Sequence, residues 1–198
     1  MRAFDRAETT LVTSGARVIR YDLPGHGGSS LGRESQTLES CAEVLTGIGL
    51  AAKIQQPILF GKGFGAYLCL HAARLGHIRP RAILLWRPLL GPPSWGTQMF
   101  NQLTSLAVDR LSARTIETLW PTEPTDTLHT RARMTASIRA LTEYATLLTN
   151  LPVIRLSDFD ESFPILLLDR GQDISQANLG TKLADTLQQI GLLNPHDP

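Results

Sequence analysis

The chain has 198 residues, a formal net charge of +1 and charged residues of both signs along its whole length. The length favours one domain with a single hydrophobic core, and the balanced charge gives no broad basic surface of the kind that binds nucleic acid or anionic lipid. No apolar run reaches the roughly 18 to 20 residues of a membrane span, and the N-terminus lacks the apolar run of a signal peptide.

The first elements in chain order are a short helix, a strand and a glycine-rich loop. Residues 4–14 carry apolar residues near helical spacing, and Gly15 can take the left-handed conformation that ends a helix. The β-branched run over residues 16–22 predicts a strand. The Leu-Pro-Gly-His-Gly-Gly-Ser-Ser stretch that follows predicts a loop. Taken alone, this pattern also fits any α/β protein with a glycine-rich strand exit.

A second helix and a strand-turn-helix unit come next. The apolar spacing over residues 38–50 predicts a helix, with Ser35 or Thr37 as its N-cap. Residues 57–70 are typical of a buried strand, a tight glycine turn and the start of a helix, and Gly76 is a plausible cap at the end of that helix.

Cys41 and Cys69 are the only cysteines, and each falls on one of these two helices. Their apolar surroundings predict reduced core thiols rather than a disulfide or a metal site. A cytoplasmic location is the corresponding expectation.

The rest of the chain returns to the sheet after an insertion. Residues 80–90 predict a buried strand, so that strand and helix alternate as in a parallel sheet with right-handed crossovers. Residues 94–120 and 128–148 are amphipathic and helical, and residues 163–173 predict a strand ending in a G-x-D loop, followed by a helix from Leu179 to Leu187. The large apolar residues of the insertion are expected to pack onto the core rather than to line a pocket: Trp95, Met99, Phe100, Trp120, Met134 and Tyr144.

Two motifs resemble those of the α/β-hydrolases. The stretch R-V-I-R-Y-D-L-P-G-H-G-G-S-S is similar to the strand and D-x-x-G-x-G-x-S loop of that family. The G-K-G-F-G turn at residues 61–65 is similar to the G-x-S-x-G nucleophile elbow, with Gly63 at the position of the serine. In the family, Asp22 and Ser29 tend to brace the loop, while Gly25 and Gly27 allow a backbone path that side chains would block.

This resemblance implies an α/β fold. We expect a mostly parallel sheet of the α/β-hydrolase type that lacks its first strands, in a single domain over residues 1–198. Its core would comprise residues 1–93 and 152–198, and a helical lid would span about residues 94–151. The stretches Y-D-L-P-G-H-G-G-S-S, G-K-G-F-G-A and I-L-L-W-R-P-L-L-G also resemble the hydrolase-like proteins associated with bacterial exosortase systems.

The resemblance also implies a candidate site. The family order of nucleophile, acid and histidine places Gly63, Asp173 and His196 at the three catalytic positions. The N–H of Phe64 would be one oxyanion donor, whereas the loop that supplies the other donor would precede the first helix. Lys62, beside the turn, is a candidate for anion binding at the helix N-terminus.

Each of these residues also has an ordinary structural interpretation. Asp173 or Ser175 can simply cap the next helix, His196 lies two residues from the end of the chain, and Lys62 can be solvated. Ser29 and Ser30 lie on a neighbouring loop, but the sequence places no base beside them.

Three functions remain open at this point. The first is a degenerate hydrolase that binds an ester, acyl or peptide-like ligand, or a protein partner, without serine-type turnover. The second is a working hydrolase in which Asp173 and His196 activate water or a non-standard nucleophile. The third is a structural subunit whose exposed sheet edge pairs with another chain or a second copy. No cofactor and no metal site are predicted, because the histidines lack ligand spacing with cysteines or carboxylates: His26, His71, His77 and His129.

Overall fold

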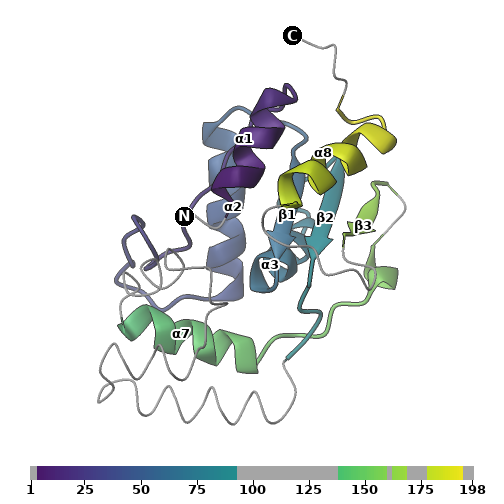
Figure 1. Ribbon diagram of the computed structural model, residues 1–198. Coiled ribbons are helices and arrows are strands. Elements are labelled where there is room, and N and C mark those ends of the chain that lie inside the picture. Colours follow the sequence, from purple (N-terminus) through teal and green to yellow (C-terminus); the bar gives the residue numbers. More distant parts are fainter. Residues whose placement is uncertain (1–3, 93–137, 160–161, 169–177, 194–198) are drawn as a thin grey trace.

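The computed structural model describes residues 4–92, 138–159, 162–168 and 178–193, which form a parallel sheet covered by helices on both faces (Figure 1). The strands are β1 (Ile58–Lys62), β2 (Ala82–Trp86) and β3 (Ile165–Leu167). They lie in the order β1-β2-β3, and both pairs are parallel. The predicted parallel α/β sheet is therefore confirmed.

The helices begin and end close to the predicted positions. They are α1 (Asp5–Thr13), α2 (Leu38–Ala51), α3 (Phe64–Arg74), α7 (Ile138–Thr149) and α8 (Leu179–Gln189), with a short 3-10 helix, η2, at Leu156–Asp158. The Thr37 hydroxyl accepts the N–H of Ser40 at 3.0 Å, as an N-cap does. Gly15 and Gly76 have φ values of 89° and 70°, so each supplies the left-handed turn predicted after its helix.

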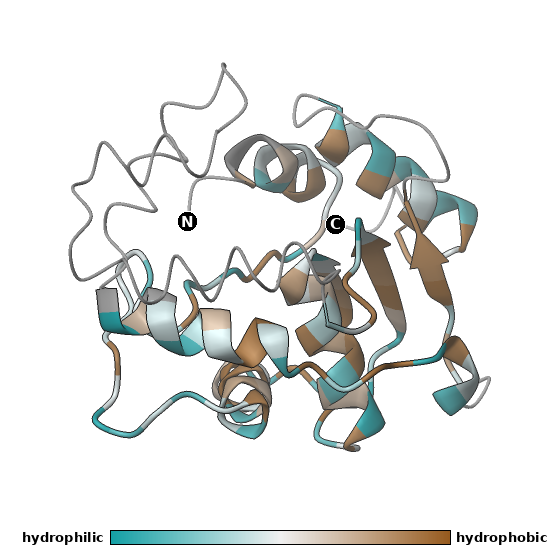
Figure 2. Ribbon diagram, turned by 90° about the horizontal axis from the view of Figure 1, so that it is seen from below, coloured by the Kyte–Doolittle hydropathy of each residue, from teal (hydrophilic) through white to brown (hydrophobic). Residues whose placement is uncertain are grey.

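The two faces of the sheet carry separate hydrophobic cores. Ile83 and Leu85 of β2 face a core shared with α2, α3 and α7, whereas Leu84 and Trp86 face a core shared with α1 and α8. All five residues of β2 are buried, as expected for a central parallel strand with helices on both sides. In Figure 2 the strands are mainly hydrophobic, while the helices around them carry both hydrophilic and hydrophobic residues.

The predicted strand over residues 16–22 is wrong. The structure assigns no strand there, and Arg17, Val18, Ile19 and Tyr21 make no backbone hydrogen bond to another described residue. A β-branched run becomes a strand only when a neighbouring strand pairs with it. No described strand pairs with this segment, so it runs as unassigned chain between α1 and the loop at residues 23–30.

Part of the predicted lid packs against the core. The C-terminal part of the predicted helix at residues 128–148 corresponds to α7, whose Ala140 and Tyr144 are buried in the core of α2 and α3. This confirms the expectation that Tyr144 packs onto the core. Residues 93–137 lie outside the described residues, and with them the predicted helix at 94–120 and five of the apolar residues named above: Trp95, Met99, Phe100, Trp120 and Met134.

Gly180 allows α1 and α8 to cross closely on one face of the sheet (Figure 1). A Cβ placed on Gly180 would lie 2.9 Å from the Cα of Ala7 and 2.7 Å from the Oγ1 of Thr10. Both distances are shorter than real Cβ contacts, so any larger residue would push the two helices apart.

We expect Gly180→Ala to lower the free energy of unfolding by about 1 to 3 kcal/mol, because overpacking outweighs the better helix propensity of alanine. Urea unfolding followed by circular dichroism measures this change. The matched control is Gly47→Ala on α2, where an added Cβ would meet nothing within 4 Å. That control should stabilise the protein slightly, and equal behaviour of the two variants would contradict the close crossing.

Candidate functional site

The candidate site is the turn between β1 and α3 at the carboxyl edge of the sheet. Gly61 lets the strand meet the helix, because a Cβ there would overlap the backbone nitrogen of Ala66. Gly63 then turns the chain with φ 55° and ψ −117°, a conformation that L side chains rarely adopt. The sequence therefore forms a sharp strand-to-helix corner with Gly63 at its tip.

Three hydrogen bonds hold Gly63 in place. Its N–H donates to the carbonyl of Trp86 at 3.0 Å, and its carbonyl accepts from the N–H groups of Tyr67 at 3.2 Å and Leu89 at 3.3 Å. These bonds tie the tip to the end of β2 as well as to α3. The backbone of the corner is thus fixed by its neighbours on two sides.

The space into which a side chain at position 63 would project is empty of described atoms. A Cβ built there would meet nothing within 4 Å, in contrast to Gly61. A residue with a hydroxyl would therefore fit in this space, at the cost of an unfavourable φ. Glycine itself offers no oxygen, sulfur or nitrogen atom with which to attack a carbonyl.

Phe64 follows the tip as the first residue of α3. Its N–H makes no hydrogen bond to another described residue, as is usual in the first turn of a helix, where the N–H groups lack partners within the helix. Its ring stacks on Tyr67 at 6.3 Å between centroids and meets Tyr144 edge-on at 5.8 Å. The corner therefore presents a backbone donor beside the half-buried Phe64 ring, which packs on two buried tyrosine rings.

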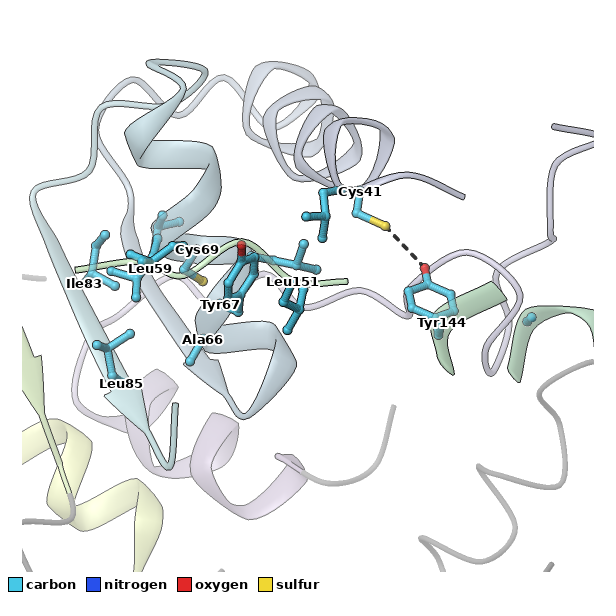
Figure 3. Close-up of a cluster of buried hydrophobic side chains, with 14 residues drawn as sticks. Cys41, Leu59, Ala66, Tyr67, Cys69, Ile83, Leu85, Tyr144 and Leu151 are labelled. Carbon is cyan, nitrogen blue, oxygen red and sulfur yellow. Dashed lines mark hydrogen bonds between the residues drawn. The ribbon is translucent and has the colours of Figure 1, made fainter. Parts of the chain in front are cut away.

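Tyr144 of α7 connects this aromatic cluster to the rest of the fold. Its hydroxyl lies 3.6 Å from the Sγ of Cys41 on α2, and the two side chains point toward one another in Figure 3. The ring also meets His26 of the glycine-rich loop edge-on at 4.9 Å. Burial raises the pKa of Tyr144, and its contact with Cys41 acts in the same direction, so the phenol stays neutral.

Sequence reasoning did not anticipate this role of α7. The helix is also held by its polar face, where Glu143 accepts the N–H of Gln36 at 3.0 Å and Arg139 donates to the carbonyl of Arg33 at 2.7 Å. Arg139 and Glu143 pair with each other at 2.7 Å. The spacing of Arg139 and Glu143, one helical turn apart, was the available signal, but it does not say which loop the pair would hold.

The glycine-rich loop is braced much as the family resemblance implied. The Ser29 hydroxyl donates to the carbonyl of Asp22 at 2.7 Å, and the Gly28 N–H donates to the Asp22 carboxylate at 3.1 Å. Gly25 and Gly27 have φ values of 77° and 53°. Since the Ser29 hydroxyl is used in this brace, it serves the loop rather than a reaction.

Lys62 points to the opposite face of the sheet from Leu59. Its Nζ lies 4.3 Å from the ring centroid of Trp86, a cation–π distance. The two residues are also register partners in the β1 and β2 ladder. The ammonium group is thus held over an aromatic ring next to the corner, and its predicted role in anion binding stays a prediction.

Asp173 and His196 lie outside the described residues. β3 leads toward Asp173, and α8 follows it along the chain. The structure therefore places the corner at Gly63 and Phe64 but not the predicted acid and base. Both remain predictions from the family resemblance.

The two cysteines are buried and unpaired, as predicted. Burial raises the pKa of Cys69 to about 12 and also raises the pKa of Cys41. A thiol with a raised pKa holds little thiolate at neutral pH, so neither is an activated nucleophile. In the parts of the chain that the structure describes, no three His, Cys, Asp or Glu residues gather as a metal site.

No helix among the described residues is long and apolar enough to cross a membrane.

His71 on α3 is a buried titratable group behind the corner. Its ring stacks on Tyr67 at 5.9 Å, and its Nε2 has no hydrogen-bond partner among the described residues. Burial lowers the pKa of His71, and Arg74 lowers it further, while the carboxylate of Glu39, 3.9 Å away, acts in the opposite direction. The imidazole is therefore neutral in the folded protein at neutral pH.

This lowered pKa predicts a loss of stability in weak acid. As the pH falls below about 6.5, the ordinary histidine pKa, His71 becomes protonated in the unfolded chain but stays neutral in the folded protein. The free energy of unfolding therefore falls until the pH is low enough to protonate the folded group as well. We expect His71→Gln to remove this part of the pH dependence in urea unfolding between neutral and weakly acid pH. His77→Gln, which removes an exposed imidazole, should retain it; equal slopes for His71→Gln and the parent chain would contradict the assignment.

Comparisons with known proteins agree with this geometry. A carboxylesterase structure from Nitrososphaera gargenis superposes with a TM-score of 0.72 at 16% identity, covering 96% of this chain and 74% of that one. The structure of MenH from S. aureus has a TM-score of 0.69 at 19% identity, and the match covers 93% of this chain and 76% of that one. A hydrolase from Pseudomonas aeruginosa PA01 also has a TM-score of 0.69, at 16% identity, and the match covers 95% of this chain and 84% of that one. At these identities the likeness shows the fold alone.

The sequence comparisons give the family. No curated protein sequence matches the chain. A sequence model described as the alpha/beta hydrolase family matches residues 3–189, which is nearly the whole chain. The chain belongs to the alpha/beta hydrolase family.

Proposed function

We propose that this chain binds a small acyl or ester ligand in an α/β-hydrolase frame without serine-type turnover. The observation that carries the proposal is Gly63, which stands at the tip of the strand-to-helix corner with open space where a side chain would project. Serine-type acyl transfer needs an oxygen nucleophile at that tip. A glycine there leaves the frame without one.

The same corner supports ligand binding. The Phe64 N–H lies in the first turn of α3, where backbone donors favour a carbonyl oxygen or an anion. The half-buried ring of Phe64 lies beside that donor and packs on the buried rings of Tyr67 and Tyr144. A carbonyl at the donor and an acyl chain along the Phe64 ring is the arrangement that suits an ester-like ligand.

Asp173 and His196 are assigned here as a remnant acid and base. In a serine hydrolase they would orient and deprotonate the nucleophile. Without a hydroxyl at position 63 they would act only if they activated water, which is the competing hypothesis of a working hydrolase. Similar structures include a carboxylesterase and a thermophilic esterase, so an ester is the natural first ligand class to test.

Two finer assignments belong to this proposal. The likeness to the exosortase-associated hydrolase-like proteins rests on the sequence stretches around the elbow, above all Leu85-Trp86-Arg87-Pro88. The cytoplasmic location rests on the two buried, reduced thiols, Cys41 and Cys69.

A protein partner at the sheet edge is a second candidate function. The observation that favours it is that β1 pairs with β2 on one side and with no described strand on the other. An unpaired edge is a ready template for another strand.

The first experiment uses a fluorophosphonate probe, which labels activated serines. We expect no serine of the parent chain to be labelled, because the tip carries none. Labelling at Ser29 or Ser30, mapped by mass spectrometry, would overturn the proposal, and so would ester hydrolysis above the buffer rate. Either result would favour the working hydrolase.

The matched variants are Gly63→Ser and Gly63→Ala. Both add a side chain at a positive φ and should destabilise the protein by about 1 to 3 kcal/mol, so they are compared with each other and not with the parent. If Asp173, His196 and the oxyanion donors are in place, Gly63→Ser should be labelled at position 63 and should hydrolyse an ester roughly 10²-fold or more faster than Gly63→Ala, which cannot be labelled there. An equal rate for both variants would contradict the assignment of Asp173 and His196.

A further inference from the structure

The amino edge of the sheet, opposite the corner, carries a group of basic side chains. Residues 44–108 are an exception to the even spread of charge along the chain, because they contain no aspartate or glutamate but six lysines and arginines: Lys53, Lys62, Arg74, Arg79, Arg81 and Arg87. Three of the six lie exposed on the turns that lead into β1 and β2, and Arg17 joins them from the chain after α1. We call these four exposed residues the basic edge: Arg17, Lys53, Arg79 and Arg81.

The end of α2 brings two members of the basic edge together. The Nη1 of Arg17 donates to the carbonyl of Ala52 at 3.2 Å, and Lys53 is the next residue in the chain. The Lys53 N–H donates to the carbonyl of Leu50 at 2.9 Å, and its φ of 56° turns the chain away from the helix. The Arg17 guanidinium therefore lies beside the backbone that carries Lys53.

The loop after α3 brings the other two members to the same end of the sheet. The Arg81 N–H donates to the carbonyl of Pro57 at 2.9 Å, so Arg81 lies beside the start of β1. Ile78 lies against the last part of α2, where a Cβ on Gly49 would be 3.8 Å from the Cδ1 of Ile78. Because Arg79 follows Ile78 in the chain, all four cations belong to neighbouring turns at one edge of the molecule.

The basic edge has no counter-charge among the described residues. None of its four side chains pairs with a carboxylate there, unlike Arg20 and Arg139, each of which pairs with a glutamate. Like charges that lie close together without carboxylates between them give a locally positive surface potential. A surface of this kind attracts anions.

Exposed aliphatic side chains lie among these charges. Val12 in the last turn of α1 is 53% exposed, Leu50 in the last turn of α2 is 72% exposed, and Leu75 directly after α3 is 41% exposed. Each comes shortly before a member of the basic edge in the chain. The large hydrophobic residues exposed in the described part of the chain include no aromatic residue. This edge therefore combines unpaired cations with aliphatic groups.

We propose that the basic edge binds the surface of an anionic lipid bilayer, with Leu50 and Leu75 entering the headgroup region. Anionic headgroups attract lysine and arginine, and exposed leucines add apolar contact at the acyl boundary. Nucleic acid also attracts cations, but proteins that bind single strands stack the bases on aromatic rings, and the described residues of this edge expose none. The proposal goes beyond the acyl-ligand function and does not depend on it.

The position of the basic edge determines how a bound molecule would face the bilayer. β1 begins beside the basic edge at Ile58 and ends at Lys62, next to the corner. In Figure 1, β1 and β2 point toward the side of the molecule that carries α7. The candidate site would therefore lie on the side away from the bilayer.

Co-sedimentation of the full chain with lipid vesicles tests the proposal. We expect vesicles of phosphatidylglycerol mixed with phosphatidylcholine to bind the protein at least about tenfold more tightly than vesicles of phosphatidylcholine alone. Raising the salt from about 0.1 M to about 1 M should release most of the protein, because the Debye length falls from about 10 Å to about 3 Å. Equal binding to both kinds of vesicle, or no binding to either, would overturn the proposal.

Two double variants of equal charge locate the surface. Lys53→Gln with Arg79→Gln should weaken vesicle binding roughly tenfold to thirtyfold, since each cation near an anionic membrane strengthens binding about fivefold. Lys182→Gln with Arg33→Gln removes two exposed cations elsewhere, on α8 and in the loop before α2, and should change binding by less than about twofold. Equal weakening in both double variants would contradict the assigned location. Urea unfolding of both should match the parent chain, because all four side chains are exposed.

A short DNA duplex decides between lipid and nucleic acid. If the duplex binds the parent chain through Lys53 and Arg79 while the vesicles do not bind, the proposal is overturned in favour of nucleic acid. Leu50→Gln should weaken binding to the anionic vesicles, and unchanged affinity would overturn the role given to this leucine. None of these readouts involves an ester or a fluorophosphonate, so the acyl-ligand proposal and this one can fail separately.

Discussion

The contact on which the candidate site depends is the one between Gly61 and the backbone of Ala66. Because Gly61 has no Cβ, β1 can pass directly against the first turn of α3, and the chain can reverse within the few residues around Gly63. The hydrogen bond from Gly63 to Trp86 then ties the corner to the neighbouring strand. A side chain at position 61 would separate strand from helix and remove the corner altogether.

The side-chain contacts of Tyr144 hold three of the elements that surround the corner. This residue joins α7 to α2 through Cys41, to the glycine-rich loop through His26 and to the corner through Phe64. The polar face of α7 adds the contacts of Arg139 and Glu143 to the chain before α2. Within the described residues, α7 is therefore held against the corner by contacts on both its apolar and its polar face.

Local signals in the sequence predicted most of the fold. The left-handed glycines at 15 and 76, a helix cap at Ser35 or Thr37 and the buried strand of Ala82–Trp86 each follow from a residue type and its immediate neighbours. The prediction of a strand at residues 16–22 failed because strand pairing depends on a neighbouring strand, which no local sequence pattern reveals. The Cys41 and Tyr144 contact joins positions 103 residues apart, so apolar spacing alone could not predict it.

The site was predictable only in part for the same reason. The G-K-G-F-G turn shows the corner and its missing hydroxyl directly, since both are properties of consecutive residues. The partners of a catalytic triad come from distant parts of a chain, and Asp173 and His196 were assigned by family order alone.

The central claim is that the frame binds an acyl compound which it cannot cleave. Equilibrium binding of p-nitrophenyl butyrate, followed by mass spectrometry of the recovered ester, tests this most directly. The account predicts saturable binding, recovery of the intact ester and no acylated protein. Release of p-nitrophenol at a rate that saturates with ester concentration would contradict it.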